Sequence, residues 1–520
     1  MKRLTVLAFA VLLAAAPGVF AGSEAETAAA DEGPVVINWV GLRLKTPGGA
    51  LYPQPDSPII QEFNKALDID LRAVKSDFGN AEEMNLMFAA GEIPDHMLAN
   101  QNNMLRYREE GLLRAIPLDM VREHAPTYWR DYANGMVEGI WFDFPSWDKD
   151  TESLWALPNG GLEIKHQVVV RGDWLQAVGA SAPTTVEEFA EVARRFTYDD
   201  PDGNGQKDTW GMATSATSAS NWTNNLRTFM AAFGYEHIER PYLDPATGEV
   251  TFFEVTDGWR DFLRWMNGMW EAGVIHPDVT LPDKLAVGSL FQDGKVGFAG
   301  DTWTWVLPKY RPGTWFPNLF EKDSNATVEY VGQLTAAGYE PTWELRPALW
   351  TYHTIGKDTS DLVLEKILGV IDLQLADPFF HNLIWSGVEG EHFEFDEDGM
   401  RQFLPAAQGM EAQGDLGVKF FLTNIRYGWM FTASFGSDAE EMAARQESYN
   451  IINPVLGHGW VLDSQNQYRA DMARIREEYM WKAITGDADT DGDWDTYVKQ
   501  WMRAGGEEVL AEARAKHAGM

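Results

Sequence analysis

Three neighbouring stretches decide the fold: VVINWV at residues 35–40, PIIQEFNKAL at 58–67 and IDLRAV at 69–74. The first is a short run rich in β-branched residues, and the third alternates apolar and polar residues; both patterns are typical of strands. The second places apolar side chains such as Ile59 and Phe63 at the spacing of one helix face. Strand, helix and strand in this order predict a βαβ unit, and therefore a mainly parallel sheet flanked by helices.

The same alternation continues along the chain. A helical pattern from Asn80 to Ala90 precedes a strand-like run at 93–98, and the Val168–Val170 strand precedes helical patterns at 185–196 and 262–270. No sequence repeat with a fixed period of 20 to 50 residues is present, which excludes a solenoid or a propeller. The pattern therefore predicts two or more α/β lobes.

Composition excludes several classes of function. Lys and Arg number 42 against 78 Asp and Glu, which gives a net charge of −36 over 520 residues. Such a field repels nucleic acid phosphates and anionic lipid headgroups. Cysteine is absent, so the chain has no disulfide, no thiolate metal ligand and no Cys nucleophile.

The N-terminal residues have the pattern of a secretory signal peptide. Met1-Lys2-Arg3 is followed by an apolar run and by Val19-Phe20-Ala21, which predicts a signal peptide at 1–21 and cleavage after Ala21. Residues 22–33 form a flexible leader without large apolar residues. Because residue 22 is Gly and not the Cys of a lipoprotein, we expect a periplasmic or secreted protein without a direct membrane anchor.

An acidic loop after the 185–196 pattern has the spacing of a calcium site. Oxygen-bearing side chains alternate along it with Gly205 at the sixth position, a spacing that wraps a loop around Ca²⁺. The twelfth residue is Gly211 and not the bidentate Glu of a tight EF-hand, so we expect a weak structural site. An Asx-rich surface turn is the alternative. The candidate ligands are Asp200, Asp202, Asn204, Gln206 and Asp208.

A second acidic loop covers residues 487–495. It matches the same spacing, but Val498 occupies the twelfth position. A helix is expected from Trp494, and Asp493 or Asp495 would suit its N-cap and first turn. Whether this loop binds a second Ca²⁺ is left open by the sequence.

No catalytic cluster can be assigned. The chain has no His-Glu-x-x-His, no Gly-x-Ser-x-Gly and no glycine-rich phosphate loop. His276, His353 and His392 are isolated in the sequence, and we expect each to be structural. Zinc, nucleotide and serine-hydrolase chemistry are therefore not predicted.

Several of the 22 tryptophans stand beside loops that follow strands or helices. Trp303 and Trp305 follow a glycine-rich strand and point to the same face. Trp385 and Trp429 also lie beside polar loops. A Trp face with neighbouring polar groups suits a sugar ring, although core packing is the alternative for each Trp.

Longer motifs carry a family resemblance, and they span almost the whole chain. The chain resembles the family 1 extracellular solute-binding proteins of sugar ABC transporters, in the lipoprotein-type branch that includes alginate-oligosaccharide binders. The matching segments are RGDWL at 171–175, DPDGNG at 200–205, LWALP at 154–158, GVEGEH at 387–392, and ITG at 484–486 with WDTYV at 494–498.

The resemblance implies an α/β, two-lobed periplasmic-binding-protein fold (type II, venus-flytrap) with extended hinge crossings. An oligosaccharide would lie between the lobes, without catalysis. It also implies a structural Ca²⁺ in the loop at 200–208. Two departures from the family are Thr209, where alginate binders carry an acidic residue, and the missing lipoprotein Cys.

We expect an N-terminal lobe at 34–162 plus about 349–385, and a C-terminal lobe at 163–348 plus about 386–520. The hinge crossings are expected near Leu162–Val168, Leu349–Ile355 and Trp385–Gly390. Closure of the lobes on the sugar would create the form that docks on the permease.

The chain is therefore interpreted as the substrate-binding component of an ABC importer, working as a monomer. Net charge narrowly favours a neutral oligosaccharide, although Arg171 and Arg426 could favour a uronate. The candidate ligand-binding residues are Trp303, Trp305, Trp385, Trp429, Asp301, Glu389, Arg426 and, less strongly, Trp222.

Two alternatives remain open at this stage. A secreted carbohydrate-active hydrolase or lyase would share the signal, the aromatic residues and the calcium loop, but would consume the sugar. A peptide-binding or sensor protein could use the same fold.

Overall fold

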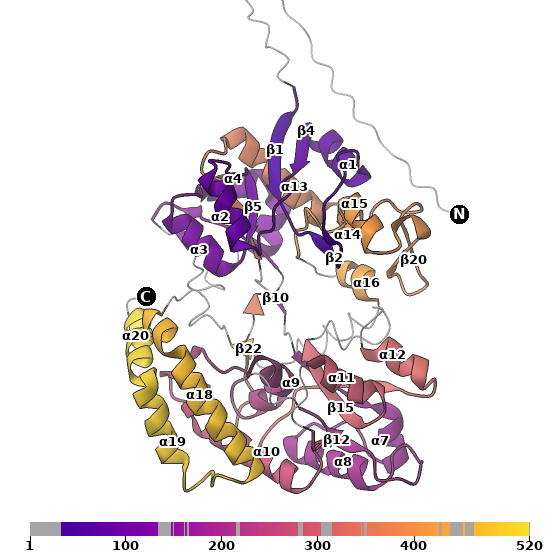
Figure 1. Ribbon diagram of the computed structural model, residues 1–520, viewed down its shortest axis with the longest axis vertical. Helices are drawn as coiled ribbons and strands as arrows, with labels where there is room; N and C mark the ends of the chain where they lie inside the picture. The colour runs from indigo at the N-terminus through magenta and orange to yellow at the C-terminus, as the bar shows by residue number, and fades with distance from the viewer. Residues whose placement is uncertain are drawn as a thin grey trace, which may run out of the picture.

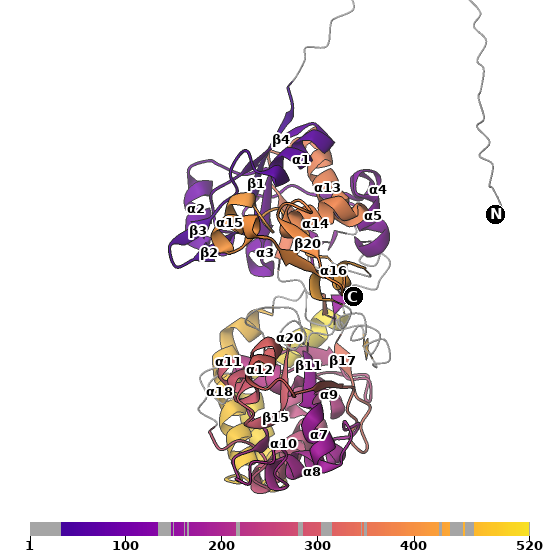
Figure 2. The same ribbon diagram turned by 90° about the vertical axis from the view of Figure 1, so that its right-hand side faces the viewer.

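The protein folds into two lobes (Figures 1 and 2). The computed structural model describes residues 33–133, 147–148, 150–160, 162–163, 166–214, 219–278, 284–302, 315–344, 346–347, 351–425, 429–436, 451–452 and 462–518. The predicted signal peptide and all but the last residue of the leader lie outside these ranges. Within them, no helix has the length and apolar character needed to cross a membrane.

Lobe one is built on a five-stranded sheet in the order β4-β1-β5-β19-β9. β1 runs parallel to β4 and β5, whereas β19 runs antiparallel to both β5 and β9. The prediction of a mainly parallel sheet therefore holds for the βαβ unit and fails at the far edge. The strands are β1 (Val35–Val40), β4 (Ile69–Ala73), β5 (His96–Ala99), β9 (Leu157–Asn159) and β19 (Thr351–Ile355).

Local sequence explains the first helices of lobe one. Ser57 caps α1 (Pro58–Leu67) by accepting a hydrogen bond from the Ile59 amide, and Asn80 caps α2 (Ala81–Ala89) in the same way. α1 buries Ile59, Ile60 and Phe63 against the sheet. The other early elements are β2 (Leu44–Thr46), β3 (Gly49–Leu51), α3 (Gln101–Glu109), β6 (Ile116–Pro117), α4 (Leu118–His124), α5 (Pro126–Tyr128), a π-turn (Trp129–Ala133), β7 (Trp147–Asp148) and β8 (Ser153–Leu154).

A late segment of the chain also belongs to lobe one. Phe420, Phe421 and Ile425 are buried in the lobe-one core, and the Leu42 amide donates to the Phe420 carbonyl at 2.9 Å. The segment comprises α13 (Asp361–Ala376), α14 (Pro378–Ser386), β20 (Phe393–Phe395), β21 (Arg401–Phe403), a 3₁₀ turn (Pro405–Ala407), α15 (Met410–Leu416) and α16 (Trp429–Phe435). The expected crossing to the second lobe near 385–390 is therefore wrong, because buried apolar residues hold the chain in lobe one for at least 40 residues more.

Lobe two contains a four-stranded sheet in the order β12-β15-β11-β16. β12 and β15 are parallel, and β11 is antiparallel to both of its neighbours. Thr185 caps α8 by accepting a hydrogen bond from the Glu188 amide. The elements are β11 (His166–Arg171), α7 (Gly172–Val178), α8 (Val186–Tyr198), β12 (Trp210–Met212), α9 (Ala219–Ala232), β13 (Pro241–Leu243), β14 (Val250–Phe252), a 3₁₀ turn (Phe253–Val255), α10 (Asp257–Glu271), α11 (Lys284–Gln292), β15 (Val296–Thr302), α12 (Trp315–Lys322) and β16 (Val328–Val331).

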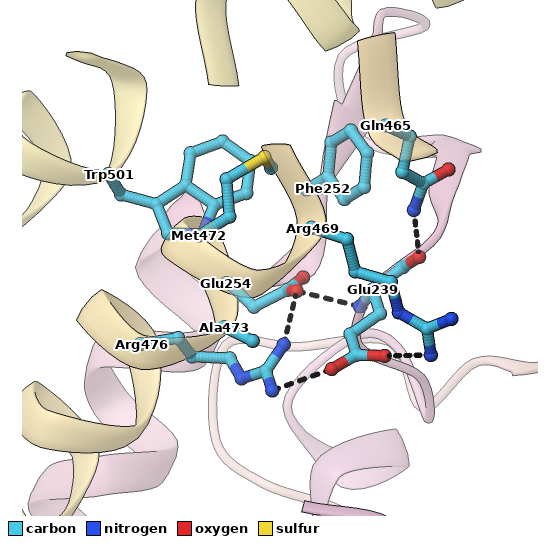
Figure 3. Close-up of a pocket in the computed structure, with 9 residues that line it drawn as sticks. All are labelled: Glu239, Phe252, Glu254, Gln465, Arg469, Met472, Ala473, Arg476 and Trp501. Atoms are coloured by element: carbon cyan, nitrogen blue, oxygen red, sulfur yellow. Dashed lines mark hydrogen bonds and ion pairs between the residues drawn. The ribbon is translucent and has the colours of Figure 1, made fainter. Parts of the chain in front are cut away.

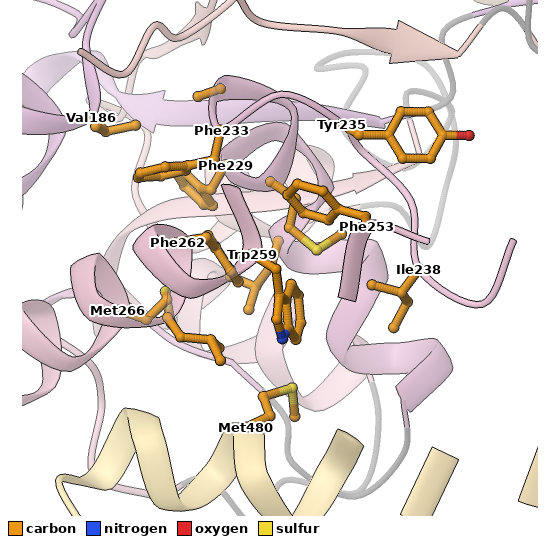
Figure 4. Packing of buried hydrophobic residues seen from close by; sticks show 14 of the residues in the cluster. Val186, Phe229, Phe233, Tyr235, Ile238, Phe253, Trp259, Phe262, Met266 and Met480 are labelled. Carbon is orange, nitrogen blue, oxygen red and sulfur yellow. The ribbon is translucent and has the colours of Figure 1, made fainter. Parts of the chain in front are cut away.

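The C-terminal helices complete lobe two. α18 (Asp463–Thr485), α19 (Trp494–Trp501) and α20 (Glu507–Ala518) follow one another along one side of the lobe, with a π-turn (Met502–Gly506) between the last two (Figure 1). Trp259 and Met266 of α10 pack in one buried cluster with Met480 of α18 (Figure 4). The last 60 residues are therefore an integral part of this core.

Short strand pairs mark the passages between the lobes. β10 (Leu162–Glu163) pairs antiparallel with β18 (Arg346–Pro347), between the two lobes (Figure 1). β17 (Trp343–Glu344) pairs with β22 (Ile451–Ile452) at the edge of lobe two. Ser434 still accepts a hydrogen bond from Arg401, so the chain belongs to lobe one at least as far as residue 434.

Candidate functional site

The loop at 200–208 links the end of α8 to the start of β12. Its tight path needs left-handed backbone at Gly203 and Gly205, and Asp200 itself has a φ of 51°. The Gly205 amide donates to Asp200 Oδ2 at 3.0 Å, and the Gln206 amide donates to Asn204 Oδ1 at 2.7 Å. The loop is therefore wound around its own polar side chains.

Three carboxylates meet in this loop. Asp200 Oδ1 is buried without a hydrogen-bond partner. The pKa of Asp202 is raised, first by burial and then by the neighbouring Asp200 and Asp208. The loop thus gathers negative charge that a divalent cation would neutralise, and oxygen donors are the ligands that Ca²⁺ prefers.

Positive and polar groups of the chain already engage part of this donor set. Lys295 Nζ lies 2.6 Å from Asp208 Oδ2, and this contact is the main cause of the lowered pKa of Asp208. Asn204 Nδ2 donates to Asp202 at 2.7 Å and to Asp208 at 3.2 Å. Across the described ranges, no three Asp, Glu or His side chains are arranged as a ready metal site. The donor chemistry suits Ca²⁺, but binding would require Asn204 and Lys295 to shift.

The contacts of Thr209 give a physical reason for its departure from the alginate-binder pattern. It is buried, and its Oγ1 donates to the Phe196 carbonyl at 2.7 Å. The hydroxyl therefore hydrogen-bonds to a carbonyl near the end of α8 and contributes no oxygen ligand to the loop.

The acidic loop at 487–495 is organised differently. Arg264 of α10 forms an ion pair with Asp491, and Asp489 Oδ1 accepts from the Asp491 amide at 2.9 Å. Asp493 stands directly before α19, as the sequence predicts, but its carboxylate accepts from the Asp489 amide instead of capping the helix. This loop is closed by a protein cation and by its own backbone.

Trp385 lies at the end of α14 and is half-buried against the lobe-one core. Lys419 Nζ is 5.0 Å and the Arg401 guanidinium 5.6 Å from the centre of its ring. Both contacts are in the range of cation–π interactions. Glu389 is exposed in the turn that leads to β20. These two predicted ligand residues are on the same lobe and close in sequence.

The other predicted ligand residues are only partly covered by the structure. Trp303, Trp305 and Arg426 lie outside the described residues. For Trp222, Trp429 and Asp301 the structure gives the backbone, which lies in α9, α16 and β15 respectively, and not the side chain.

Arg171 has a structural role. Its side chain is 3% exposed, pairs with Asp173 at 2.6 Å and Asp323 at 2.9 Å, and lies over the Trp174 ring. All of its strong contacts are therefore internal to lobe two, which removes it as a reason to expect a uronate.

Sequence reasoning missed a buried imidazole pair in lobe one. His96 Nε2 and His353 Nδ1 are 2.9 Å apart, and the Trp39 ring stacks on His96 with centroids 3.4 Å apart. Burial lowers the pKa of His353 to about 3 and that of His96 well below its usual value, so both rings are neutral. His353 is structural, as predicted, but its partner 257 positions away left no local signal.

Comparison with curated proteins gives relatives that match along almost the whole chain. The polygalacturonan/rhamnogalacturonan-binding protein YtcQ of Bacillus subtilis is 23% identical over 542 residues, covering 96% of each chain. The lipoprotein LipO of the same organism is 22% identical and covers 88% of each. The chain is thus similar, along almost its whole length, to carbohydrate-binding solute-binding proteins of ABC transporters. The matched proteins are non-catalytic binding proteins, which favours the binding hypothesis over the enzyme alternative. No family model matches the chain.

Solved structures of solute-binding proteins show the same fold. A human-milk-oligosaccharide-binding protein from Bifidobacterium longum infantis aligns with a TM-score of 0.66 at 16% identity, over 93% of this chain and 98% of its own. The alginate-binding protein AlgQ2, solved without calcium ion, aligns at 0.60 and 17% over 93% and 98%. An EF-hand mutant of the FusA protein of S. pneumoniae aligns at 0.60 and 18% over 93% and 99%. The predicted two-lobed α/β fold is confirmed.

These similarities indicate the substrate-binding component of a carbohydrate ABC importer that works outside the cytoplasm. The same similarities imply an oligosaccharide ligand and the subunits of an ABC transporter as partners.

Proposed function

We propose that this solute-binding protein captures an oligosaccharide between its two lobes and releases it to the permease. The observation that carries the proposal is similarity over 96% of the chain to a protein named for binding polygalacturonan and rhamnogalacturonan. Sugar contacts to both lobes would stabilise the closed arrangement through their differential affinity.

The ligand is tested by thermal unfolding of the mature protein against neutral and uronate oligosaccharides. The relative's name favours a uronate, whereas the net charge of −36 favours a neutral sugar. A ligand that binds only the folded state raises the midpoint as its concentration passes the dissociation constant. A selective rise with one class identifies the cargo, and no rise with any sugar would contradict the proposal.

We propose stacking of the sugar on Trp303, Trp305 and Trp429, with Asp301, Glu389 and Arg426 as polar contacts and Trp222 as a weaker addition. Trp385 is the least favoured stacking residue, because Lys419 and Arg401 already lie near its ring. Trp303→Ala and Trp429→Ala should each weaken binding at least about tenfold, since aromatic contacts dominate such sites. Phe379→Ala, on an exposed ring of α14, is the matched control and should leave affinity unchanged.

We further propose that the loop at 200–208 binds a structural Ca²⁺ through Asp200, Asp202, Asn204, Gln206 and Asp208. The converging carboxylates and the partnerless Asp200 Oδ1 support it. A bound cation would tie the end of α8 to the start of β12. Calorimetric titration of chelator-treated protein with CaCl₂ tests the site.

Two finer features of the mature protein are also proposals. Cleavage after Ala21 would leave Gly22 at the N-terminus and no lipid anchor, in contrast to the relative named as a lipoprotein. Intact-mass measurement of protein from its native envelope would give the unmodified mass from Gly22, and a mass increased by acyl chains would contradict this. Light scattering should give the mass of a monomer.

A further inference from the structure

A small cavity lies inside lobe two, beneath α18 and against the segment from Glu239 to Glu254 (Figure 3). It offers about 10 Å³ to the centre of a water-sized molecule, which is close to the smallest space that holds one water. One side of the cavity is apolar, with Met472 and Trp501. The other side is charged, with Glu239, Glu254 and Arg476.

The charged side is a network that fastens α18 to the rest of the lobe. Arg476 of α18 reaches Glu239 at 2.7 Å and Glu254 at 3.6 Å. Arg469, two turns earlier on the same helix, reaches Glu239 at 3.0 Å. Glu254 Oε1 also accepts from the Glu239 amide at 2.6 Å. The network therefore joins the last long helix to residues more than 200 positions earlier.

Among the carboxylates of this network, Glu254 has the fewest neighbouring groups that stabilise its ionised form. Its side chain is 1% exposed, and its Oε2 has no hydrogen-bond partner. Arg476 shares its positive charge among three carboxylates, Glu239 at 2.7 Å, Glu477 at 3.3 Å and Glu254 at 3.6 Å, and lies farthest from Glu254. The Nε of Arg476 also has no partner. An ionised carboxylate with so few donors is costly to bury.

We propose that Glu254 is a proton-linked latch: its neutral form holds α18 tightly on lobe two, and its ionisation loosens the helix. One water in the cavity would serve both forms, because it can donate to an ionised Oε2 and accept from a protonated one. Nothing in the sugar-binding function requires this latch, so it stands independently of the ligand.

The groups around Glu254 are consistent with this role. Burial, the largest cause, raises the pKa of Glu254 to about 7, although Arg476 opposes the rise. Glu239 has a lowered pKa and stays ionised. Tyr497 of α19 donates to the Glu254 carbonyl at 3.1 Å, and burial raises the pKa of Tyr497 and of Tyr242 on β13, so both stay neutral. Glu254 is thus the one group of this set that changes charge near neutrality.

The sign of the effect follows from linkage. Glu254 has a higher pKa when α18 is docked than when the carboxyl meets water, where about 4.3 is usual. Glu254 therefore stabilises the docked α18 fully when the pH is below its pKa in water, about 4.3. This stabilisation is lost as the pH rises through about 7. The opening constant of α18 should increase over this window and level off above it.

Hydrogen exchange of the full-length mature protein at pH 5.5, 6.5, 7.5 and 8.5 tests the latch, after correction for intrinsic exchange rates. Protection of α18 amides should fall about tenfold across this window relative to α8, which is in the same lobe. Glu254→Gln keeps the shape of the side chain and removes the proton, so the fall should disappear. Glu249→Gln, in the loop just before β14 with a largely exposed side chain, is the matched control and should behave as the wild type.

Two outcomes would overturn the latch. One is a pH dependence of α18 protection in the wild type no larger than that of α8. The other is Glu254→Gln retaining the full dependence. Should Glu254→Gln not fold, the contrast between α18 and α8 in the wild type still decides, because it needs no variant.

Discussion

The two acidic loops of lobe two have nearly the same spacing of oxygen side chains and different structures. In the loop at 200–208 burial and the neighbouring Asp200 and Asp208 raise the pKa of Asp202, and Asp200 Oδ1 is left without a partner. In the loop at 487–495 the corresponding acids bond their own backbone, and Arg264 supplies a positive charge to Asp491. Spacing alone therefore does not make a calcium site. What decides is whether the surrounding chain neutralises the carboxylates first.

Position along the fold adds to this difference. The first loop lies between α8 and β12, next to the start of β15, so it borders the lobe-two sheet. The second leads into α19 on the outer helical layer, where α10 presents Arg260 and Arg264. The first loop pairs with one Lys from outside it, Lys295, and the second docks on a helix that presents two guanidinium groups.

Removal of calcium should give the largest contrast between the two loops. At 10 mM Ca²⁺ and a dissociation constant of about 10⁻⁴ M, binding would stabilise lobe two by about 2.7 kcal/mol, or roughly 5 °C in its midpoint. We expect excess chelator to lower the calorimetric midpoint by that amount. Asp200→Asn with Asp208→Asn should abolish the response, and Asp489→Asn with Asp491→Asn should leave it intact. If both double variants lost the response to Ca²⁺ equally, the two loops would not differ as calcium sites.

Lys295 should set the strength of the first site. Its ammonium lies 2.6 Å from Asp208 and repels an incoming divalent cation. We expect Lys295→Met to tighten Ca²⁺ binding about tenfold in calorimetry, the effect of removing one nearby unit charge in a largely aqueous setting.

Lys322→Met is the matched control for Lys295→Met. Lys322 pairs with Asp293 at the surface of the same lobe, so its loss makes the same change in net charge away from the loop. Equal tightening in both variants would indicate a general charge effect and not competition at Asp208.

Breaking the protein cation of the second loop should have a smaller effect. Arg264 and Asp491 are largely exposed, so the pair is worth about 0.2–1 kcal/mol. Arg264→Met should lower the free energy of unfolding by about that much in urea titrations. Ca²⁺ should not restore it, because the loop acids stay bonded to backbone amides. Recovery in Ca²⁺ would show that the loop is a latent site.

Asp202→Asn should give the smallest effect, and one that changes sign. Without metal, Asp200 and Asp208 raise the pKa of Asp202, so loss of its charge relieves repulsion and the midpoint should rise slightly. With Ca²⁺ the same variant loses a ligand and its midpoint should fall. Asp495→Asn, in the first turn of α19, should show no such reversal. Melting curves in both conditions test this.

Local structure could be predicted from the sequence because it depends on local signals. β1 occupies Val35–Val40 and α1 Pro58–Leu67, as the patterns predict, and Thr185 caps α8. Spacing also predicted a Ca²⁺ site in the loop at 200–208, which stays a prediction. The lobe to which residues 388–435 belong could not be predicted in this way. Their apolar residues would suit either core, and the contact between Gly41 and Phe420 that leaves no room for a Cβ is set only by tertiary packing.

Side-chain contacts across long sequence distances were equally hidden. The predicted stacking role of Trp385 took no account of Lys419 and Arg401 beside its ring. Arg264 and Asp491 are 227 positions apart, and no pattern in either segment indicates the other. The sequence shows which groups are present, and the fold decides which of them are already paired.

The place of β19 in the lobe-one sheet has a consequence for the time course of folding. Thr354 pairs with Met97 although 257 positions separate them, and β19 fills the gap between β5 and β9. Lobe one cannot close its sheet until residues 351–355 have been synthesised, after most of lobe two. Such distant pairing makes folding slow, and a chain cut before Thr351 would present two open strand edges to other chains. The exported chain is thereby kept from early folding by its own topology.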